Sequence, residues 1–196
     1  MIHTIKTAPA VEPLTLAEMR QYLGIGDPTA IDRDAVITAR VKTARKIVEN
    51  YTGRALINQT WQAVGEDFGD VIMLVAPLVS VTSIKYTDSN GTQQTLAGSE
   101  YYVQTKNARI VTAYGKTWPT VRSDVEPVIV EYVAGYGADG DAVPGALKEA
   151  IALLVSVWEQ FQSSQAGLGY PPDLPNACRT LMNPYNDYRN IARSNG

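Results

Sequence analysis

The fold is decided by residues 143–161, VPGALKEAIALLVSVWEQF, which follow the glycine-rich stretch 134–137. Pro144 suits the first turn of a helix, where its missing N–H group would be unpaired anyway. Apolar side chains then recur at helical spacing on one face, at Leu147, Ile151, Leu154, Trp158 and Phe161. A second apolar face adjoins the first, and a narrow polar stripe is left at Glu149, Ser156, Glu159 and Gln160. Such a helix is buried against several elements, so we expect a central helix at about residues 144–163.

This helix is not a membrane span, because charged residues interrupt the run of roughly 18 apolar residues that a span requires. The chain of 196 residues is 45% hydrophobic and 19% charged, which suits one globular domain, with or without an insertion. Its net charge of -3 lacks the concentrated Lys and Arg that tight binding to DNA phosphates requires. The lone Cys178 and a polar start without a signal peptide favour a cytoplasmic origin.

Two helices are expected before the strand-rich part of the chain. Thr15 and Glu18 form a capping-box pattern, and Gly24 suits a left-handed stop, which predicts a helix over about residues 15–23. A longer helix is expected over 31–52, with Gly53 as its stop. Its other side carries a basic stripe, which we interpret as a solvated face, the alternative being a surface for an acidic partner or a neighbouring subunit. The stripe consists of Arg33, Arg40, Lys42, Arg45 and Lys46.

Residues 56–133 change to short β-branched and aromatic runs separated by turn residues, which predicts an antiparallel β region inserted between helices. The expected strands are 57–64, 71–75, 79–87, 94–96, 101–105, 108–112 and 128–133. Residues 88–91, DSNG, predict a hairpin turn, and Lys106 with Asn107 predicts a weaker one. The apolar alternation changes phase between Val81 and Ile84, which indicates a β-bulge.

After the breaker-rich linker 166–175, a last helix is expected over 176–182, followed by a polar tail with few residues able to anchor it. The predicted fold is therefore α+β: a small helical bundle around a buried central helix, with an inserted antiparallel β region and a C-terminal tail. We expect one domain over residues 1–182 and the tail over 183–196.

Residue patterns typical of catalytic sites are nearly absent from the sequence. The only histidine, His3, is expected in an unanchored N-terminal arm, and Cys178 is read as structural. Asp139 and Asp141 are interpreted as turn residues, because the spacing of a calcium loop is missing. We therefore expect no catalytic residue, no cofactor and no metal. Trp61, Trp118 and Trp158 are interpreted as packing residues.

Three stretches in this order resemble the head-tail connector (adaptor) proteins of tailed phages and gene transfer agents. They are residues 52–61, TGRALINQTW; residues 129–136, IVEYVAGY; and residues 143–158, VPGALKEAIALLVSVW. Residues 181–185, LMNPY, match the family's ending, and Asn186 stands where many relatives carry Arg or Lys. The likeness covers nearly the whole chain and contains no catalytic motif.

The resemblance implies a ring of about twelve copies beneath the portal, at the head-tail junction of the virion, after assembly in the host cytoplasm. It implies contacts with the portal, with neighbouring copies and with a stopper or tail-terminator protein, while duplex DNA passes through the lumen. The C-terminal segment is expected to reach the portal through Asn183, Pro184, Tyr185, Tyr188, Arg189 and Arg193. Contacts between subunits are expected at Arg40, Lys42, Arg45, Lys46, Asn90 and Gly91.

Two other functions stay open at this point. A tail-completion or stopper protein would occupy the next ring of the same assembly. A small β-rich module for peptide or carbohydrate would use an aromatic platform of Trp61, Trp118, Tyr101 and Tyr102. Exposure of these rings favours the module, and burial of the tryptophans favours the adaptor.

Overall fold

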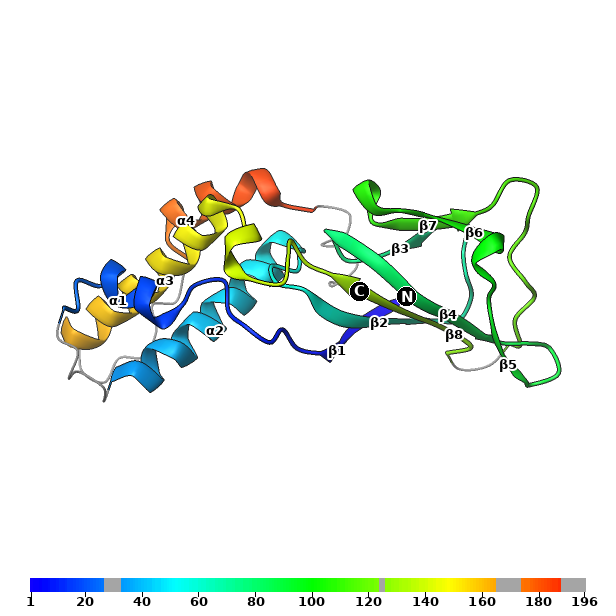
Figure 1. Ribbon diagram of the computed structural model, residues 1–196, viewed down its shortest axis with the longest axis horizontal. Coiled ribbons are helices and arrows are strands. Elements are labelled where there is room, and N and C mark those ends of the chain that lie inside the picture. Colours follow the sequence, from blue (N-terminus) through cyan, green and yellow to red (C-terminus); the bar gives the residue numbers. More distant parts are fainter. Residues whose placement is uncertain (27–32, 124–125, 165–173, 188–196) are drawn as a thin grey trace. The chain divides into compact units, whose positions relative to one another are not determined.

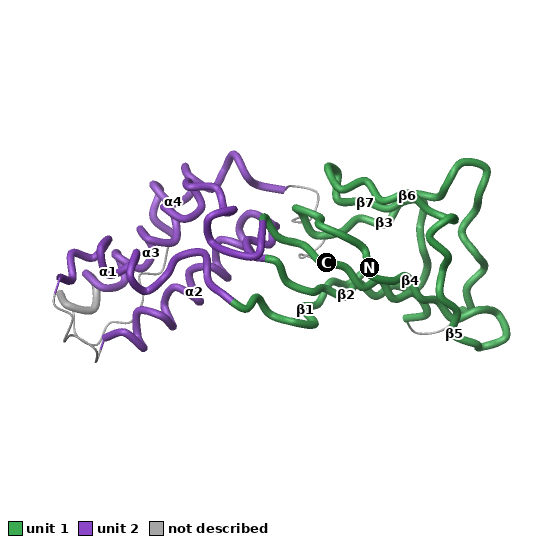
Figure 2. The backbone as a smooth tube through the Cα atoms, viewed as in Figure 1, with its two compact units in different colours: residues 1–10, 58–136 green, residues 11–57, 137–196 purple. Residues whose placement is uncertain are grey.

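The structure is a computed structural model that describes residues 1–26, 33–123, 126–164 and 174–187, with the side chains of 161–164 left out (Figure 1). The chain divides into two compact units, coloured green and purple in Figure 2. The β unit comprises Met1–Ala10 and Asn58–Tyr136, and the helical unit comprises Val11–Ile57 and Gly137–Gly196. Residues 58–136 are therefore inserted between helical segments, whereas residues 1–10 of the β unit precede the helices.

The β unit contains a five-stranded antiparallel sheet in the order β1-β2-β8-β4-β5. Its strands are β1 (Ile2–Thr7), β2 (Gln59–Gly65), β8 (Val128–Ala134), β4 (Leu78–Thr87) and β5 (Gln93–Thr95). The register of β4 against β8 shifts between Val81 and Ser83, which confirms the predicted bulge. A second shift lies between Leu78 and Ser80.

Strict alternation along β8 gives this sheet one core face and one outer face. Val128, Val130, Tyr132 and Ala134 are buried, whereas Ile129, Glu131 and Val133 between them are half-buried. The directly opposed residues Ala63 on β2 and Ile84 on β4 lie on the same core face as Val130.

A second, three-stranded antiparallel sheet has the order β3-β7-β6. Its strands are β3 (Ile72–Met73), β7 (Arg109–Thr112) and β6 (Tyr101–Gln104). The turn between β6 and β7 contains Lys106 and Asn107, so the predicted hairpin is present. Ala108 takes the left-handed conformation there, with φ 46°.

The helical unit consists of α1 (Leu16–Tyr22), α2 (Asp34–Thr52), α3 (Gly145–Ser164) and α4 (Asn176–Met182). Thr15 and Glu18 form the predicted capping box, and Gly53 ends α2 with φ 67°. The helix α3 packs against α2, α4 and α1, and its side chains Leu147, Ile151 and Leu154 are buried. The chain is thus α+β, with antiparallel sheets, as the sequence predicts.

The N-terminal arm differs from the expectation. Residues 2–7 form β1, which pairs with β2 at the edge of the five-stranded sheet. His3 is anchored, because its Nδ1 lies 2.8 Å from the hydroxyl of Tyr132 on β8. Lys6 Nζ donates to Glu131 Oε1, also on β8, at 2.5 Å. Both contacts reach past the intervening strand β2, so the description of His3 as lying in an unanchored arm was wrong.

Candidate functional site: assembly surfaces

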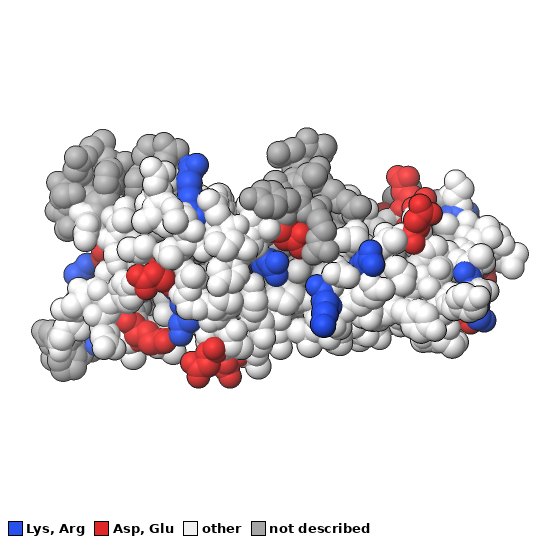
Figure 3. All heavy atoms as spheres, turned by 90° about the horizontal axis from the view of Figure 1, so that it is seen from above, with Lys and Arg blue, Asp and Glu red and all other residues white. Residues whose placement is uncertain are grey.

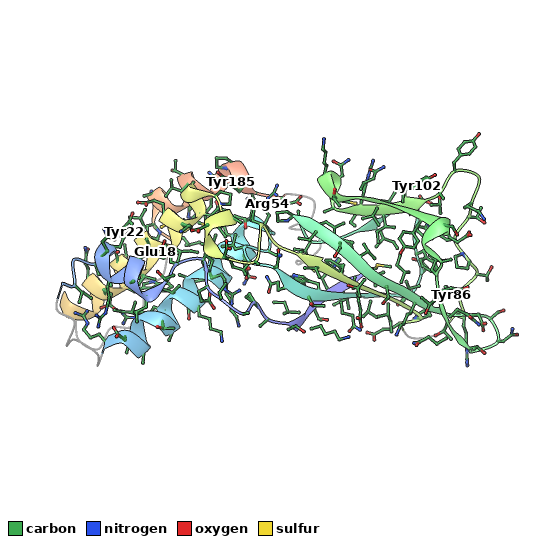
Figure 4. The ribbon with its side chains drawn as sticks, in the orientation of Figure 1. Glu18, Tyr22, Arg54, Tyr86, Tyr102 and Tyr185 are labelled. Atoms are coloured by element: carbon green, nitrogen blue, oxygen red, sulfur yellow. The ribbon has the colours of Figure 1, made fainter. Side chains whose placement is uncertain are left out.

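The start of the C-terminal segment is held against the end of α2. Tyr51 Oη donates to Asn183 Oδ1 at 2.8 Å, and Arg54 Nε donates to the carbonyl of Tyr185 at 2.5 Å. The N–H group of Asp187 donates to the carbonyl of Thr52 at 2.7 Å. Figure 4 shows Arg54 and Tyr185 side by side. The expectation that few residues of the tail are anchored was therefore wrong for residues 183–187.

The predicted portal-binding residues fall into two groups. Asn183, Pro184 and Tyr185 form a short 3-10 helix after α4, and Asn183 and Pro184 are exposed. Tyr188, Arg189 and Arg193 lie outside the described residues.

The basic stripe of α2 is not a uniformly solvated face, and two of its five members are buried. Arg45 is 1% exposed and lies between Glu12 and Glu49, with donor-acceptor distances of 2.6 Å to each carboxylate. Arg40 is also buried and pairs with Glu159 on α3, as does the more exposed Arg33. Lys42 and Lys46 are exposed, as expected.

Glu159 corrects a second expectation, because it does not belong to a solvated polar stripe of α3. It is buried and accepts from both Arg33 and Arg40. A buried carboxylate needs such partners, because desolvation of an unpaired charge is costly. These arginines therefore tie α2 to α3 within the chain.

A groove of about 600 Å³ runs between α1 and α3. Glu18 Oε1 accepts from Lys148 Nζ at 2.9 Å, and Tyr22 Oη donates to Glu149. The backbone N–H of Thr15 donates to Glu18 and is the main cause that lowers the pKa of this carboxyl to about 2, with Lys148 adding to it. The hydrogen bond to Glu149 raises the pKa of Tyr22 to about 12. Figure 4 shows Glu18 and Tyr22 on this short helix.

The hairpin that joins β4 to β5 is organised by one carboxylate. Asp88 Oδ1 accepts from the N–H groups of Asn90 and Thr92, both at 2.9 Å, and Oδ2 accepts from Gln94 Nε2 at 3.0 Å. These hydrogen bonds lower the pKa of the Asp88 carboxyl, and the bond from the Thr92 N–H has the largest effect. Gly91 has φ 83°, a conformation that favours glycine. Asn90 and Gly91, two predicted interface residues, are exposed at the tip.

Charged side chains of both signs are interspersed on the face in Figure 3. Such a surface fits the net charge of -3 and differs from the basic stripe that DNA-neutralising proteins carry. The tryptophans do not form an open platform. Trp158 is buried, Trp61 is half-buried, and Trp118 stacks on Phe68 with ring centroids 4.9 Å apart.

The cysteine and the two aspartates that were considered for catalysis or metal binding occupy structural positions. Cys178 is buried with Sγ 3.7 Å from the Ala150 carbonyl, and burial raises the pKa of its thiol. Asp139 caps a 3-10 turn by accepting from the N–H of Asp141 at 3.2 Å. Among the described residues, no group of His, Cys, Asp and Glu is placed to hold a metal. No described helix is long and apolar enough to cross a membrane.

Comparison with known proteins then gives the family, since residues 12–170 match the HCP family, head completion protein. The chain belongs to the head completion protein family. Together with the neck structures below, this match confirms the resemblance to head-tail connectors that the sequence carries. It is a family of structural virion proteins. Curated protein sequences give no match.

Solved structures of high similarity come from gene transfer agents (GTA). A chain from the neck of an empty GTA particle, computed with C6 symmetry, matches with TM-score 0.77 and 25% identity. A chain from the virion of a native GTA particle gives 0.75 and 25%, and one from a native neck computed with C12 symmetry gives 0.74 and 24%. Each match covers 96% of this chain and 97% of the other.

Proposed function

We propose that this head completion protein is the adaptor that forms a ring beneath the portal and links the DNA-filled head to the tail. The observation that carries the proposal is the match to a neck chain over 96% of this chain and 97% of the other. The match therefore includes both the β unit and the helical unit. We place the protein at the head-tail junction of the virion, and we assign it a structural role.

In this proposal, residues 1–182 act as one connector domain whose central helix is α3, and residues 183–196 form its tail. The ring surrounds the path of the DNA. A weakly acidic subunit suits that position, because strong binding to phosphates would retain DNA that has to leave the head. A peptide- or carbohydrate-binding module is disfavoured because Trp61 is half-buried and Trp118 stacks on Phe68.

The tail is proposed to bind the portal. The hydrogen bonds at Asn183, Tyr185 and Asp187 fix the first residues of the tail against the end of α2. Portal contacts are assigned to exposed Asn183 and Pro184, to Tyr185, and to Tyr188, Arg189 and Arg193 beyond the described part.

Truncation after Asp187 tests this role without removing the anchor. We expect the shortened chain to keep the unfolding midpoint of the full chain and to lose attachment to portal-bearing heads in co-sedimentation. A full-length chain with Arg179→Ala on the exposed side of α4 serves as a control and should still attach. Attachment of the truncated chain at full level would contradict portal binding by the tail.

Contacts between neighbouring copies are proposed at the exposed part of the basic stripe. A head-to-tail ring joins two different surfaces, and Lys42 and Lys46 could face the exposed acids Glu66, Asp67 and Asp70 of the next copy. Arg40 and Arg45 would act there indirectly, by holding α2 in place through their buried carboxylate partners. Asn90 and Gly91 at the hairpin tip are proposed to meet an adjacent copy or the next ring.

A charge-swap experiment tests the lysine contact. The double variant Lys42→Glu/Lys46→Glu should raise the protein concentration needed for ring formation at least tenfold, because like charges then face each other. Adding Glu66→Lys and Asp67→Lys to the same chain should restore assembly. Unchanged assembly of the first variant would remove these lysines from the interface.

An adaptor and a stopper differ in the ring that they bind. An adaptor joins heads that carry only the portal, whereas a stopper joins only heads that already carry an adaptor ring. Co-sedimentation with both kinds of head separates the two roles.

A further inference from the structure

Two strands of the β unit lie at open sheet edges. β1 is the outermost strand of the five-stranded sheet and pairs with β2, and β6 is the outermost strand of the three-stranded sheet and pairs with β7. In the described part of the chain neither strand pairs on its other side. An open edge offers a row of backbone N–H and C=O groups to another chain.

Both edge strands expose apolar side chains on both of their faces. Ile2 and Ile5 on β1 are 68% and 44% exposed, and Tyr102 and Val103 on β6 are 56% and 37% exposed. Successive side chains of a strand point to opposite faces, so Ile2 and Ile5 lie on different faces, as do Tyr102 and Val103. A partner lying flat on one face would cover only one residue of each pair. A strand added at the edge would contact both.

The other two edges have the features that natural proteins use against pairing. β5 has only three residues, all polar and exposed, and β3 has only two residues. On β1 the register shift and Lys6 lie at the end of the strand, which leaves residues 2–5 regular. The contacts of His3 and Lys6 with β8 hold this edge in place.

We propose that β1 of one copy pairs with β6 of the next copy, so that the two sheets join across each contact in the ring. The inference rests on the ring of the proposed function. A closed head-to-tail ring needs two different surfaces on separate sides of the subunit. Figure 1 shows β1 and β6 on opposite sides of the β unit.

The side chains of the two edges match in chemistry. When the strands run antiparallel with Ile5 opposite Tyr102, Thr4 lies opposite Val103 and Ile2 lies opposite Thr105. Ile5 then contacts Tyr102 on one face, and Ile2 lies diagonal to Val103 on the other face. Pairing through the edges therefore removes exposed apolar surface from both faces at once.

Cysteine pairs test the contact, because opposed strand residues are close enough for a disulfide. The chains Ile5→Cys/Tyr102→Cys and Ile5→Cys/Val103→Cys are oxidised after assembly and run on non-reducing gels. One of the two adjacent positions on β6 shares a face with Ile5, so one chain should give a ladder of covalent multimers. Each single variant should stay monomeric, since the native Cys178 is buried.

A charge at the edge supplies a second measurement. Ile5→Lys should reduce ring assembly at least tenfold, while Val36→Lys on α2, at a site that is also 44% exposed, should not. Circular dichroism and the unfolding midpoint verify that both variants fold. Dimers from Ile5→Cys alone would indicate β1 pairing with itself and would overturn the proposal.

The outcomes separate this inference from the proposed function. If the unmodified chain assembles, neither cysteine pair gives multimers and Ile5→Lys assembles normally, the strand pairing is wrong and the adaptor role stands. If the unmodified chain forms no ring and does not join portal-bearing heads, the proposed function fails and the strand pairing fails with it.

Discussion

Arg45 carries a charge and yet is 1% exposed, because two carboxylates neutralise it. Its Nε donates to Glu12 and its Nη1 donates to Glu49, whose other oxygen accepts from the N–H of Leu56 at 2.9 Å. The spacing of Arg45 and Glu49, four residues apart in a helix, could have indicated this pair from the sequence. Glu12 lies 33 positions away, and its approach follows only from the folded chain.

Replacing Arg45 by Met should therefore destabilise the protein strongly. The buried Glu49 would lose its counter-ion, and breaking a buried pair in this way costs about 3–5 kcal/mol. Urea unfolding followed by circular dichroism measures the change in the free energy of unfolding. Lys46→Met, at the exposed neighbouring position, should stay within about 0.5 kcal/mol of the original chain. Similar stabilities for the two variants would contradict the buried network.

Ionisation of Glu18 should make the free energy of unfolding depend on pH in the acid range. Its pKa is lowered from 4.5 to about 2 in the folded chain, so its charge favours folding above pH 4.5. This contribution should be lost as the pH falls from 4.5 toward 2. Glu18→Gln keeps an oxygen for the capping box and removes the charge, so the stability gap between it and the original chain should close over that range. A gap that stays constant from pH 7 to pH 2.5 would exclude this role.

At the scale of elements, the strands 59–134 lie close to the predicted runs, because turn residues and β-branched runs are local signals. β1 could not be predicted in this way, because its sequence IHTIKT is polar and its partner strand β2 starts more than fifty residues later. Tertiary pairing decides such a strand. The anchor of residues 183–187 was missed for the same reason, since its partners lie at the end of α2.

The β4–β5 hairpin should become less ordered when Asp88 is replaced. Asp88→Ala removes the acceptor of the Asn90 and Thr92 N–H groups, so both amides lose the side-chain hydrogen bond that orders the turn. Hydrogen exchange at the Thr92 amide should then rise about tenfold, while amides of α3 keep their rates. Asp139→Ala removes a comparable carboxylate from the helical unit and should leave Thr92 unchanged. Equal exchange at Thr92 in all three chains would show that Asp88 does not organise the turn.

At the scale of the whole molecule, the family was readable from the order of three stretches that carry no catalytic group. The surfaces that assemble the ring were less accessible to sequence reasoning. The sequence pattern does not distinguish a solvated basic residue on a helix, such as Lys42, from one that is paired inside the chain, such as Arg40. Exposure on both faces of an edge strand also appears only after the sheet order is known.

The most direct test of the adaptor role is negative-stain microscopy, with mass measurement, of the purified protein mixed with portal-bearing, DNA-filled heads. The account predicts an added ring of this chain at the portal vertex, formed either from free rings or from monomers that assemble there. A protein that leaves the portal vertex bare, under conditions in which the heads retain their DNA, would contradict it.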